Sequence, residues 1–410
     1  MNNQLVLLLF FCFLFFLMSN NYMSSVGPEV KFARQQYFHR SFKKVVQLHE
    51  CTGNDNIVGH GFHVIKWAVE AWAAENDYDL KIIKSSYNRT SEVTPADYDF
   101  QYYGVGGNIR CEFPFKTFKI AVAGEVFEGN RPCEGADFIL DRQMNRVHKG
   151  CPTVHYYQGL SLPYIAGWDI KGNPWLCDDI PPVPPPGRPH GPILTISEVY
   201  KKVYDHSDAL VRSSLLGALA LEGFKVYTGS RLFHHVKGGP PFYYNKVDCK
   251  GTDIESKNCK SKFLFDIEME NTSEKGYTSE KLLVGIMAGA IPIYWGDLDY
   301  NTANTVFNPK RYIRCEFNRT AVRILDNEVH KLRKRGDQLK LHQWAVEKLN
   351  PLMEPCVDKV RQISMNVELQ KKILSERGLQ RWVCNQKIPN GYTVSNITNY
   401  INLKTLQNQK

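Results

Sequence analysis

Residues 263–297 carry the pattern that decides the fold: FLFDIEMENTSEKGYTSEKLLVGIMAGAIPIYWGD. The apolar run at 263–269 predicts a strand, the polar stretch at 270–279 a loop, residues 278–287 a helix, and 290–295 a second strand. A strand, helix and strand in this order form a parallel unit, and the loop then lies at the carboxyl end of the first strand. The segment therefore predicts a ligand site at the edge of an α/β sheet.

The same alternation of strands and helices extends over both halves of the chain. In the first half, the pattern predicts a helix at 58–75 and strands at 79–84, 118–122 and 136–140. In the second half, it predicts strands at 193–196 and 224–227, a helix from about 207 to 221, and a charged helical region from about 327. We therefore expect an α/β fold of two Rossmann-like domains that face each other across a cleft.

The domain boundaries follow from length and composition. A chain of 410 residues is longer than one hydrophobic core usually serves. The proline-rich sequence DDIPPVPPPGRPHGP ends at residue 192 and suits a stiff linker or surface loop. We predict an N-terminal segment at 1–30, one domain at 31–170, the linker at 171–192, the second domain at 193–380 and a C-terminal tail with little pattern at 381–410.

The N-terminus carries an apolar, uncharged run at residues 5–18, LVLLLFFCFLFFLM. As a helix it would be roughly 21 Å long, shorter than a hydrocarbon core of about 30 Å. It is either a signal peptide, with a small-x-small cleavage site at 25–27, or a short signal-anchor. No Lys or Arg precedes the run, which favours the anchor. We expect a single-pass type II Golgi membrane protein with a lumenal catalytic domain, or a secreted protein if the segment is cleaved.

Cysteine usage and charge agree with that compartment. Ten cysteines lie outside the apolar run and allow up to five disulfides, whose pairing the sequence leaves open. Three glycosylation triplets begin at Asn88, Asn318 and Asn396. The net charge of +9 is spread along the chain and favours an anionic ligand. No basic-aromatic array accompanies it, so nucleic acid is not an expected partner.

The loop and helix start at 270–281 have the chemistry of a diphosphate site. We expect Thr278 to cap the helix, whose first turn would hold Glu280 and Lys281. Free N–H groups at a helix start and a lysine suit a diphosphate, and Glu280 can accept hydrogen bonds from sugar hydroxyls. The structural alternative is a surface helix with a capped, acidic first turn.

Three motifs carry a resemblance to a known family: ENTSEKGYTSEK at 270–281, AIPIYWGD at 290–297 and FNPKRY at 307–312. They resemble the donor-binding signature of the α1,3-fucosyltransferases, particularly the bacterial type, and the resemblance extends over about 193–317. It implies a GT-B architecture in which the second domain binds GDP-fucose. The family's donor-binding residues fall on Asn271, Tyr277, Glu280, Lys281 and, on the helix after strand 193–196, Arg212.

The resemblance also implies an inverting transfer with a glutamate as general base in the first domain. This base falls on Glu125, which follows the predicted strand at 118–122. The spacing from Glu125 to Pro132 departs from the family pattern, so Glu128 stays a competitor. The expected acceptor is a hydroxyl of a glycan or glycoprotein, with O3 of GlcNAc or a related sugar as the expected position.

No metal is expected at the site. Asp297 and Asp299 follow the last strand of the donor motif, where loop capping suits them better than metal binding. The family's two-domain members need no bound metal, so we expect no obligatory cofactor and at most stimulation by divalent cations. Asn271 also begins a formal glycosylation triplet, which we expect to stay unmodified because a glycan would block the donor.

Two further hypotheses stay open. The loop chemistry would serve any nucleotide diphosphate, so the chain could be an inverting glycosyltransferase that uses another nucleotide sugar. A catalytically inactive, glycan-binding relative could keep the same fold. The presence of Arg212, Lys281 and Glu125 favours an enzyme over this last hypothesis.

Overall fold

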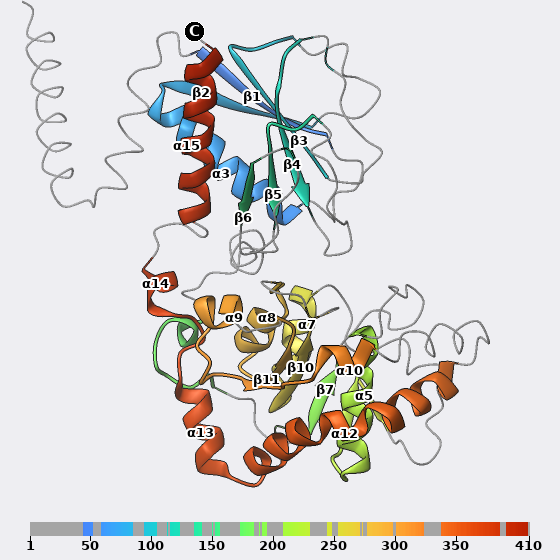
Figure 1. Ribbon diagram of the computed structural model, residues 1–410. Helices are drawn as coiled ribbons and strands as arrows, with labels where there is room; N and C mark the ends of the chain where they lie inside the picture. Colours follow the sequence, from blue (N-terminus) through green and yellow to red (C-terminus); the bar gives the residue numbers. More distant parts are fainter. Residues whose placement is uncertain are drawn as a thin grey trace, which may run out of the picture.

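The computed structural model describes residues 44–51, 59–84, 94–104, 113, 115–123, 135–141, 150, 152–155, 173–183, 188, 191–194, 208–229, 244–247, 253–270, 273, 277–297, 301–323, 338–385 and 391–408. These residues form two lobes, each built on a six-stranded sheet (Figure 1). Every strand pairing within the two sheets is parallel. The predicted fold class, two Rossmann-like α/β domains, is confirmed.

The first sheet has the strand order β2-β1-β3-β4-β5-β6. Its strands are β1 (Lys44–Glu50), β2 (Tyr78–Lys84), β3 (Tyr98–Gly104), β4 (Phe118–Ala123), β5 (Phe138–Asp141) and β6 (Thr153–His155). Helix α3 (Gly59–Glu75) packs on this sheet, with Trp72 between the rings of Tyr78, Tyr98 and Phe100. The sequence pattern predicted β2, β4, β5 and α3 but not β1, β3 or β6.

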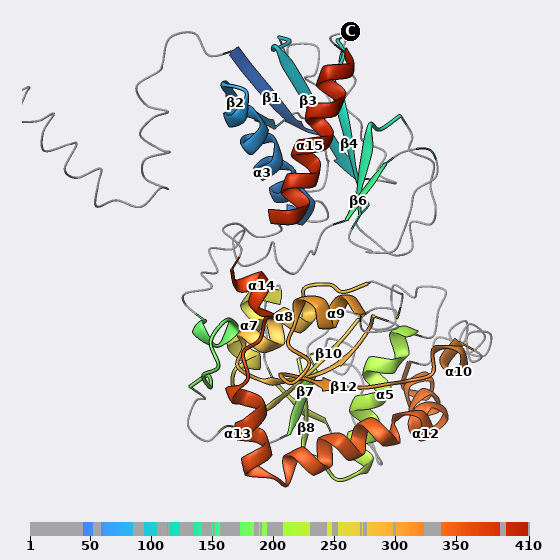
Figure 2. The same cartoon turned by 60° about the vertical axis from the view of Figure 1, so that its left-hand side comes forward.

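The last helix of the chain, α15 (Gly391–Asn408), belongs to the core of this first lobe (Figures 1 and 2). Ile397 and Ile401 are fully buried beside α3. The Tyr400 hydroxyl donates to the Asp137 carbonyl at 2.9 Å, and the Thr393 hydroxyl donates to the His155 carbonyl at 2.8 Å. The expectation of a tail with little pattern beyond residue 380 missed this helix, because its few core residues stand in a sequence rich in Asn and Thr.

The second sheet has the strand order β12-β11-β10-β7-β8-β9. Its strands are β7 (Pro192–Leu194), β8 (Val226–Thr228), β9 (Tyr244–Lys246), β10 (Phe265–Met269), β11 (Ile291–Trp295) and β12 (Ile313–Arg314). The chain adds strands in one direction from β7 to β9 and in the other from β10 to β12. The strand order therefore reverses between β7 and β10, and in open α/β sheets ligands bind at the carboxyl ends of the two strands beside such a reversal.

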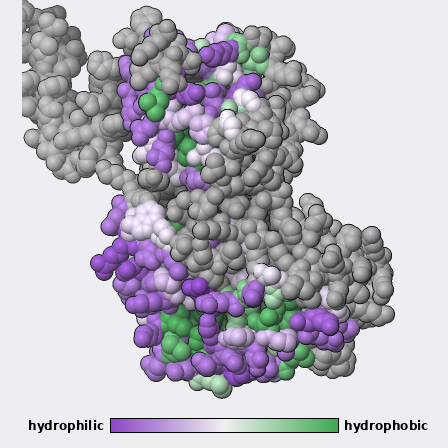
Figure 3. Space-filling view, in the orientation of Figure 1, coloured by the Kyte–Doolittle hydropathy of each residue, from purple (hydrophilic) through white to green (hydrophobic). Residues whose placement is uncertain are grey.

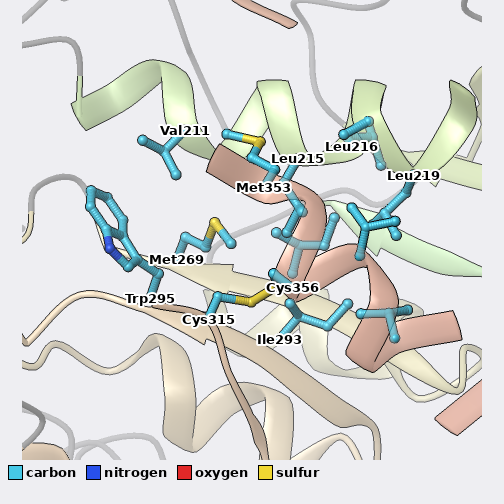
Figure 4. Packing of buried hydrophobic residues seen from close by; sticks show 14 of the residues in the cluster. Val211, Leu215, Leu216, Leu219, Met269, Ile293, Trp295, Cys315, Met353 and Cys356 are labelled. Atoms are coloured by element: carbon cyan, nitrogen blue, oxygen red, sulfur yellow. A yellow bond between two sulfur atoms is a disulfide. The ribbon is translucent and has the colours of Figure 1, made fainter. Parts of the chain in front are cut away.

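Helices cover both faces of the second sheet. On one face, α5 (Asp208–Leu221) and α12 (Gln338–Ser364) pack together, and Figure 4 shows Val211, Leu215 and Leu219 of α5 gathered with Met269, Ile293 and Met353. The same figure shows the disulfide between Cys315 and Cys356, which ties the residue after β12 to α12 inside this core. The other face carries α7 (Asp253–Lys260) and α8 (Lys281–Met287). The other helices among the described residues are α9 (Asn301–Val306), α10 (Arg319–Arg323), α13 (Val367–Ser375) and α14 (Arg381–Cys384).

The proline-rich stretch is docked on the second lobe where the structure describes it. A short 3-10 helix, η4 (Pro174–Leu176), buries Leu176 completely, and the Trp175 indole donates to the Ile286 carbonyl at 2.9 Å. A disulfide joins Cys177 to Cys384 of α14, with 5.6 Å between the Cα atoms. Pro192, the last residue of the predicted linker, opens the central strand β7, and proline is tolerated as the first residue of a strand.

The disulfides, the glycosylation triplets and the search for membrane-spanning helices bear on the expected compartment. Cys51 and Cys259 are also disulfide-bonded, in agreement with the expected use of cysteine. Asn318 is exposed and its Oδ1 accepts the Ala321 N–H, whereas Thr398 of the triplet at 396–398 is buried. No helix in the described part of the chain is long and apolar enough to span a membrane. The apolar run at 5–18 lies outside the described residues, so the anchor stays a prediction.

The surface of the described residues is mostly hydrophilic on the face shown in Figure 3, with hydrophobic residues in smaller areas of the lower lobe. A mixed surface of this kind is normal, since folded proteins keep much apolar surface exposed. Helix α15 has a buried side and an exposed side: Ile401 is fully buried, whereas Leu403, two residues later, is 60% exposed. The buried side of α15 is therefore the side that contributes to the stability of the first lobe.

We predict that Ile401→Ala destabilises the protein by roughly 2–5 kcal/mol, because it empties a fully buried aliphatic site in the first core. Leu403→Ala, on the exposed side of the same helix, should change stability by less than about 0.5 kcal/mol. Denaturant unfolding of the two variants beside the parent chain measures both values. Equal, small effects would show that α15 does not stabilise the first lobe.

Candidate functional site

The site expected from the strand order lies at the carboxyl ends of β7 and β10. The described chain resumes after β7 in α5, which begins at Asp208 and carries Arg212 in its second turn. After β10 comes Glu270, and then the segment from Tyr277 to Lys281 that leads into α8. Because β7 and β10 are parallel neighbours, both segments start from the same edge of the sheet. The topology thus brings Arg212 and the 277–281 segment to one region of the second lobe.

The predicted donor residues that the structure describes are mostly buried. Arg212 is 6% exposed, on a helix whose Val211 and Leu215 lie in the core. Tyr277 and Glu280 are also buried, whereas the Lys281 side chain keeps 19% of its surface exposed. Asn271, Glu125 and Glu128 lie outside the described residues, so their placement stays a prediction. Lys281 is thus the predicted donor residue with the most accessible described side chain.

Helix α8 begins at Lys281, three residues later than the sequence analysis expected. Glu280 occupies the N-cap position, and its side chain makes no capping hydrogen bond. The prediction of Thr278 as the cap is therefore wrong. The reason lies in Ser279, whose backbone N–H and hydroxyl both bind the carboxylate of Glu270 and hold this segment out of the helix.

Glu270 is the central residue of the site, and the sequence analysis gave it no role. Its carboxylate is fully buried directly after β10. Oε1 accepts the Ser279 N–H at 2.8 Å and Oε2 accepts the Ser279 hydroxyl at 2.6 Å. The Tyr294 hydroxyl donates to Oε1 at 3.4 Å, and the Lys281 ammonium lies 3.4 Å from Oε2. A signal was present in the sequence, since Asp266, Glu268 and Glu270 alternate with apolar residues along one strand.

Lys281 lies among oxygen atoms of the protein. Its Nζ donates to the Ser279 Oγ at 3.0 Å, and it lies 3.4 Å from Glu270 and 3.7 Å from the Oε1 of Glu280. Two carboxylates therefore accompany one ammonium at the start of α8. Burial together with the charge of Glu270 raises the pKa of Tyr294 well above its usual value, so this phenol stays protonated as a donor.

The other two acidic residues of β10 serve the packing of the same layer. The Lys260 ammonium of α7 lies 2.5 Å from the Oε1 of Glu268 and 3.4 Å from the Oδ2 of Asp266. Burial raises the pKa of Glu268 well above its usual range, and Lys260 opposes that shift. The three side chains are buried and lie on the α7 and α8 side of the sheet. We assign them a structural role.

Two arginines bind backbone carbonyls just after the C-terminal end of α8. Arg188 donates to the Gly289 carbonyl at 2.9 Å, and the fully buried Arg311 donates to the Ala290 carbonyl at 2.8 Å. Burial and, to a smaller extent, the positive charge of Arg188 lower the pKa of Arg311 to about 9. Cations are favourable at the C-terminal end of a helix. Arg311, part of the FNPKRY motif, is therefore structural in the described contacts.

Asp297 has the capping role that the sequence analysis expected. Its Oδ2 accepts the Ala303 N–H at 3.0 Å, in the first turn of α9. Asp299 lies outside the described residues. In the ranges that the structure describes, no group of three His, Cys, Asp or Glu side chains could hold a metal ion.

Comparisons with known proteins show a distant similarity between this chain and solved structures. No protein-family model matches the chain, and no curated protein matches it. Among solved structures, it is similar to an α1,3-fucosyltransferase with GDP-fucose at 13% identity and a TM-score of 0.45, over 89% of this chain and 91% of that one. It is also similar to a glycosyltransferase from Rickettsia africae ESF-5 at 10% identity and a TM-score of 0.34, over 81% of this chain and 99% of that one. Likeness at this level assigns no activity to the chain.

We predict that Asp297→Ala destabilises the protein by about 0.5–2 kcal/mol, because it removes the acceptor for a helix N–H. Asp297→Asn keeps an acceptor oxygen and should lose less. Thermal unfolding with and without EDTA measures both variants. A stability that falls on chelation in the parent chain but not in Asp297→Ala would contradict capping and indicate a metal ligand.

Proposed function

We propose that this chain is an inverting glycosyltransferase that moves L-fucose from GDP-fucose to a hydroxyl of a glycan. One observation carries the proposal: the residues matched to the fucosyltransferase donor motif follow β7 and β10, the two strands that flank the reversal of strand order. The motif is a feature of the sequence, and the reversal is a feature of the strand pairing. Their agreement favours a sugar-nucleotide site at this edge.

In this proposal, the second lobe holds the donor. Arg212 and Lys281 neutralise the diphosphate, and Glu280 accepts hydrogen bonds from fucose hydroxyls. Asn271 and Tyr277 complete the donor contacts. The bond between the anomeric carbon and the β-phosphate oxygen breaks with its electron pair on GDP, so cations placed at the diphosphate stabilise the charge that develops on the leaving group.

The first lobe supplies the acceptor side. In the sequence, Glu125 comes two residues after Ala123, the last residue of β4. It takes the proton of the acceptor hydroxyl while the oxygen attacks the anomeric carbon from the face opposite GDP. GDP is a good leaving group once its charge is held, so no second carboxylate is needed as acid. Divalent cations are then at most stimulatory.

The acceptor and the compartment belong to the same proposal. We expect a glycan or glycoprotein acceptor with O3 of GlcNAc or a related sugar as the modified position. The disulfides among the described residues support an oxidising compartment, and a Golgi-lumenal enzyme held by its N-terminal segment would meet such acceptors.

Nucleotide-dependent stability and glycosyl transfer together test this function. GDP should raise the melting temperature of the chain more than UDP or GMP at equal concentration, because the proposed site takes a guanosine diphosphate. Incubation with GDP-fucose and a glycan array should then transfer fucose, and the linkage follows from the products. Stabilisation by UDP alone would favour another nucleotide sugar, and no nucleotide effect with no transfer would favour an inactive relative.

We predict that Lys281→Ala and Arg212→Ala each lower kcat/KM for GDP-fucose by about tenfold to a hundredfold. A charge-assisted hydrogen bond to a phosphate is worth roughly 1.5–3 kcal/mol, which converts to losses of that size. Lys371→Ala is the matched control, since Lys371 lies on the exposed side of α13 and pairs only with Glu368 among the described residues. Steady-state kinetics decide, and parent-like values in either variant would remove that residue from the site.

We predict that Glu125→Gln keeps GDP affinity nearly unchanged and lowers turnover by about a hundredfold to ten-thousandfold, the usual range for loss of a general base. Gln keeps the size and hydrogen bonding of the side chain but accepts no proton. Glu128→Gln is the matched control and should be mild. If Glu128→Gln is the inactive variant instead, the base is Glu128, and if neither variant loses activity, the base lies elsewhere in the first lobe.

A further inference from the structure

We propose that Glu270 is a positioning residue for the donor: its buried carboxylate fixes the place of the Lys281 ammonium. The inference rests on the proposed function, because it names the part of the site that prepares Lys281 for a diphosphate. It adds a residue that touches no ligand and acts through Ser279 and Lys281.

The contacts form a short relay from the sheet to the ammonium. Lys281 donates to the Ser279 Oγ at 3.0 Å, and the Ser279 hydroxyl donates to the Oε2 of Glu270 at 2.6 Å. The same carboxylate binds the Ser279 N–H at 2.8 Å and lies 3.4 Å from the ammonium itself. One buried group therefore sets both the backbone before α8 and the position of the lysine head group.

Glu270 is itself held in one orientation. A Cβ at Gly296 would lie 2.2 Å from the Cγ of Glu270 and 2.7 Å from the Tyr294 hydroxyl. The glutamate side chain thus packs directly on the backbone after β11, and the Tyr294 hydroxyl donates to it at 3.4 Å. A carboxylate confined in this way gives Lys281 one place rather than many.

The consequence for binding follows from the cost of ordering. A free lysine side chain loses rotamer freedom when it is fixed, and this loss opposes binding. A lysine that is already held loses less when it meets a diphosphate, and such preorganisation strengthens binding. The buried negative charge is stabilised by donors that converge on it, as a buried carboxylate requires.

The chain offers a matched control two residues away. Glu268 lies on the same strand and the same face, is also buried, and also pairs with a lysine, Lys260 of α7. Glu268→Gln and Glu270→Gln each replace one buried carboxylate by an amide of equal size. A purely structural loss should therefore be similar in the two variants, while a loss specific to the donor should appear only in Glu270→Gln.

The test measures the KM for GDP-fucose, the KM for the acceptor, the Kd for GDP and the melting temperature of both variants. We expect Glu270→Gln to raise the donor KM and the GDP Kd by about tenfold or more and to leave the acceptor KM unchanged. Glu268→Gln should keep both donor values near those of the parent chain. Equal donor defects in the two variants, or tighter GDP binding in Glu270→Gln, would overturn the inference.

A double-mutant cycle shows whether Glu270 acts through Lys281. In a Lys281→Met background, Glu270→Gln should weaken GDP binding by less than about twofold further, because the group that it positions is absent. Additive losses would overturn the inference. If Glu270→Gln fails to fold, two milder probes replace it: Ser279→Ala removes the hydroxyl of the relay, and Gly296→Ala displaces Glu270 without any change of charge. Both should raise the GDP Kd, and parent-like binding in both would overturn the inference.

The two proposals fail in different ways. A parent chain that neither binds GDP nor transfers fucose overturns the proposed function and the inference with it. A parent chain that binds GDP and transfers fucose, with Glu270→Gln no different from Glu268→Gln, leaves the function standing and overturns the role of Glu270 alone.

Discussion

The pairing of β7 with β10 is the constraint on which the candidate site depends. In this parallel pair, Phe265 is opposite Pro192 and Asp266 is opposite Ile193, although the two strands are far apart along the chain. Because both strands end at one edge, the helix that follows each of them starts there, α5 on one face of the sheet and α8 on the other. Arg212 and Lys281 thus belong to one edge without any contact being needed between their helices. If the chain added its strands in one direction only, the helices that follow β7 and β10 would not diverge from a shared edge in this way.

The first lobe depends on the end of the chain. Its core contains Val394, Ile397 and Ile401 of α15, which come after the second lobe in the sequence. The chain passes from the first lobe to the second before η4 and returns after α14, and the disulfide between Cys177 and Cys384 ties these two passages together. The first core therefore needs residues from both sides of the second lobe in the sequence, and the contacts of α15 with it are long-range.

The sequence predicted best where apolar residues are contiguous. Strands β10 and β11 and helix α5 are buried among apolar neighbours, and their patterns were recognised. Strand β1 escaped because it carries polar residues inward: the Nε2 of His49 lies 2.8 Å from the Oδ1 of Asp99, and both side chains are buried. The start of α8 was misplaced because Ser279 gives its donors to Glu270, a tertiary contact that no local capping rule contains. The sequence could name Lys281, but only the fold could show which group holds it.

Side chains alternate between the two faces of strand β10, so that one face enters the core and the other carries acidic residues. Its odd-numbered positions, Phe265, Ile267 and Met269, enter the core under α5, and the alternate positions put Asp266, Glu268 and then Glu270 on the α8 side. Buried carboxylates are costly unless donors meet them, and each part of this row has its own lysine: Lys260 of α7 pairs with Asp266 and Glu268, and Lys281 of α8 pairs with Glu270. The pair at Lys260 is closed off from solvent, whereas Lys281 keeps part of its surface exposed at the carboxyl edge. The same arrangement that stabilises the layer therefore also holds one partly exposed cation in place at the carboxyl edge of the sheet.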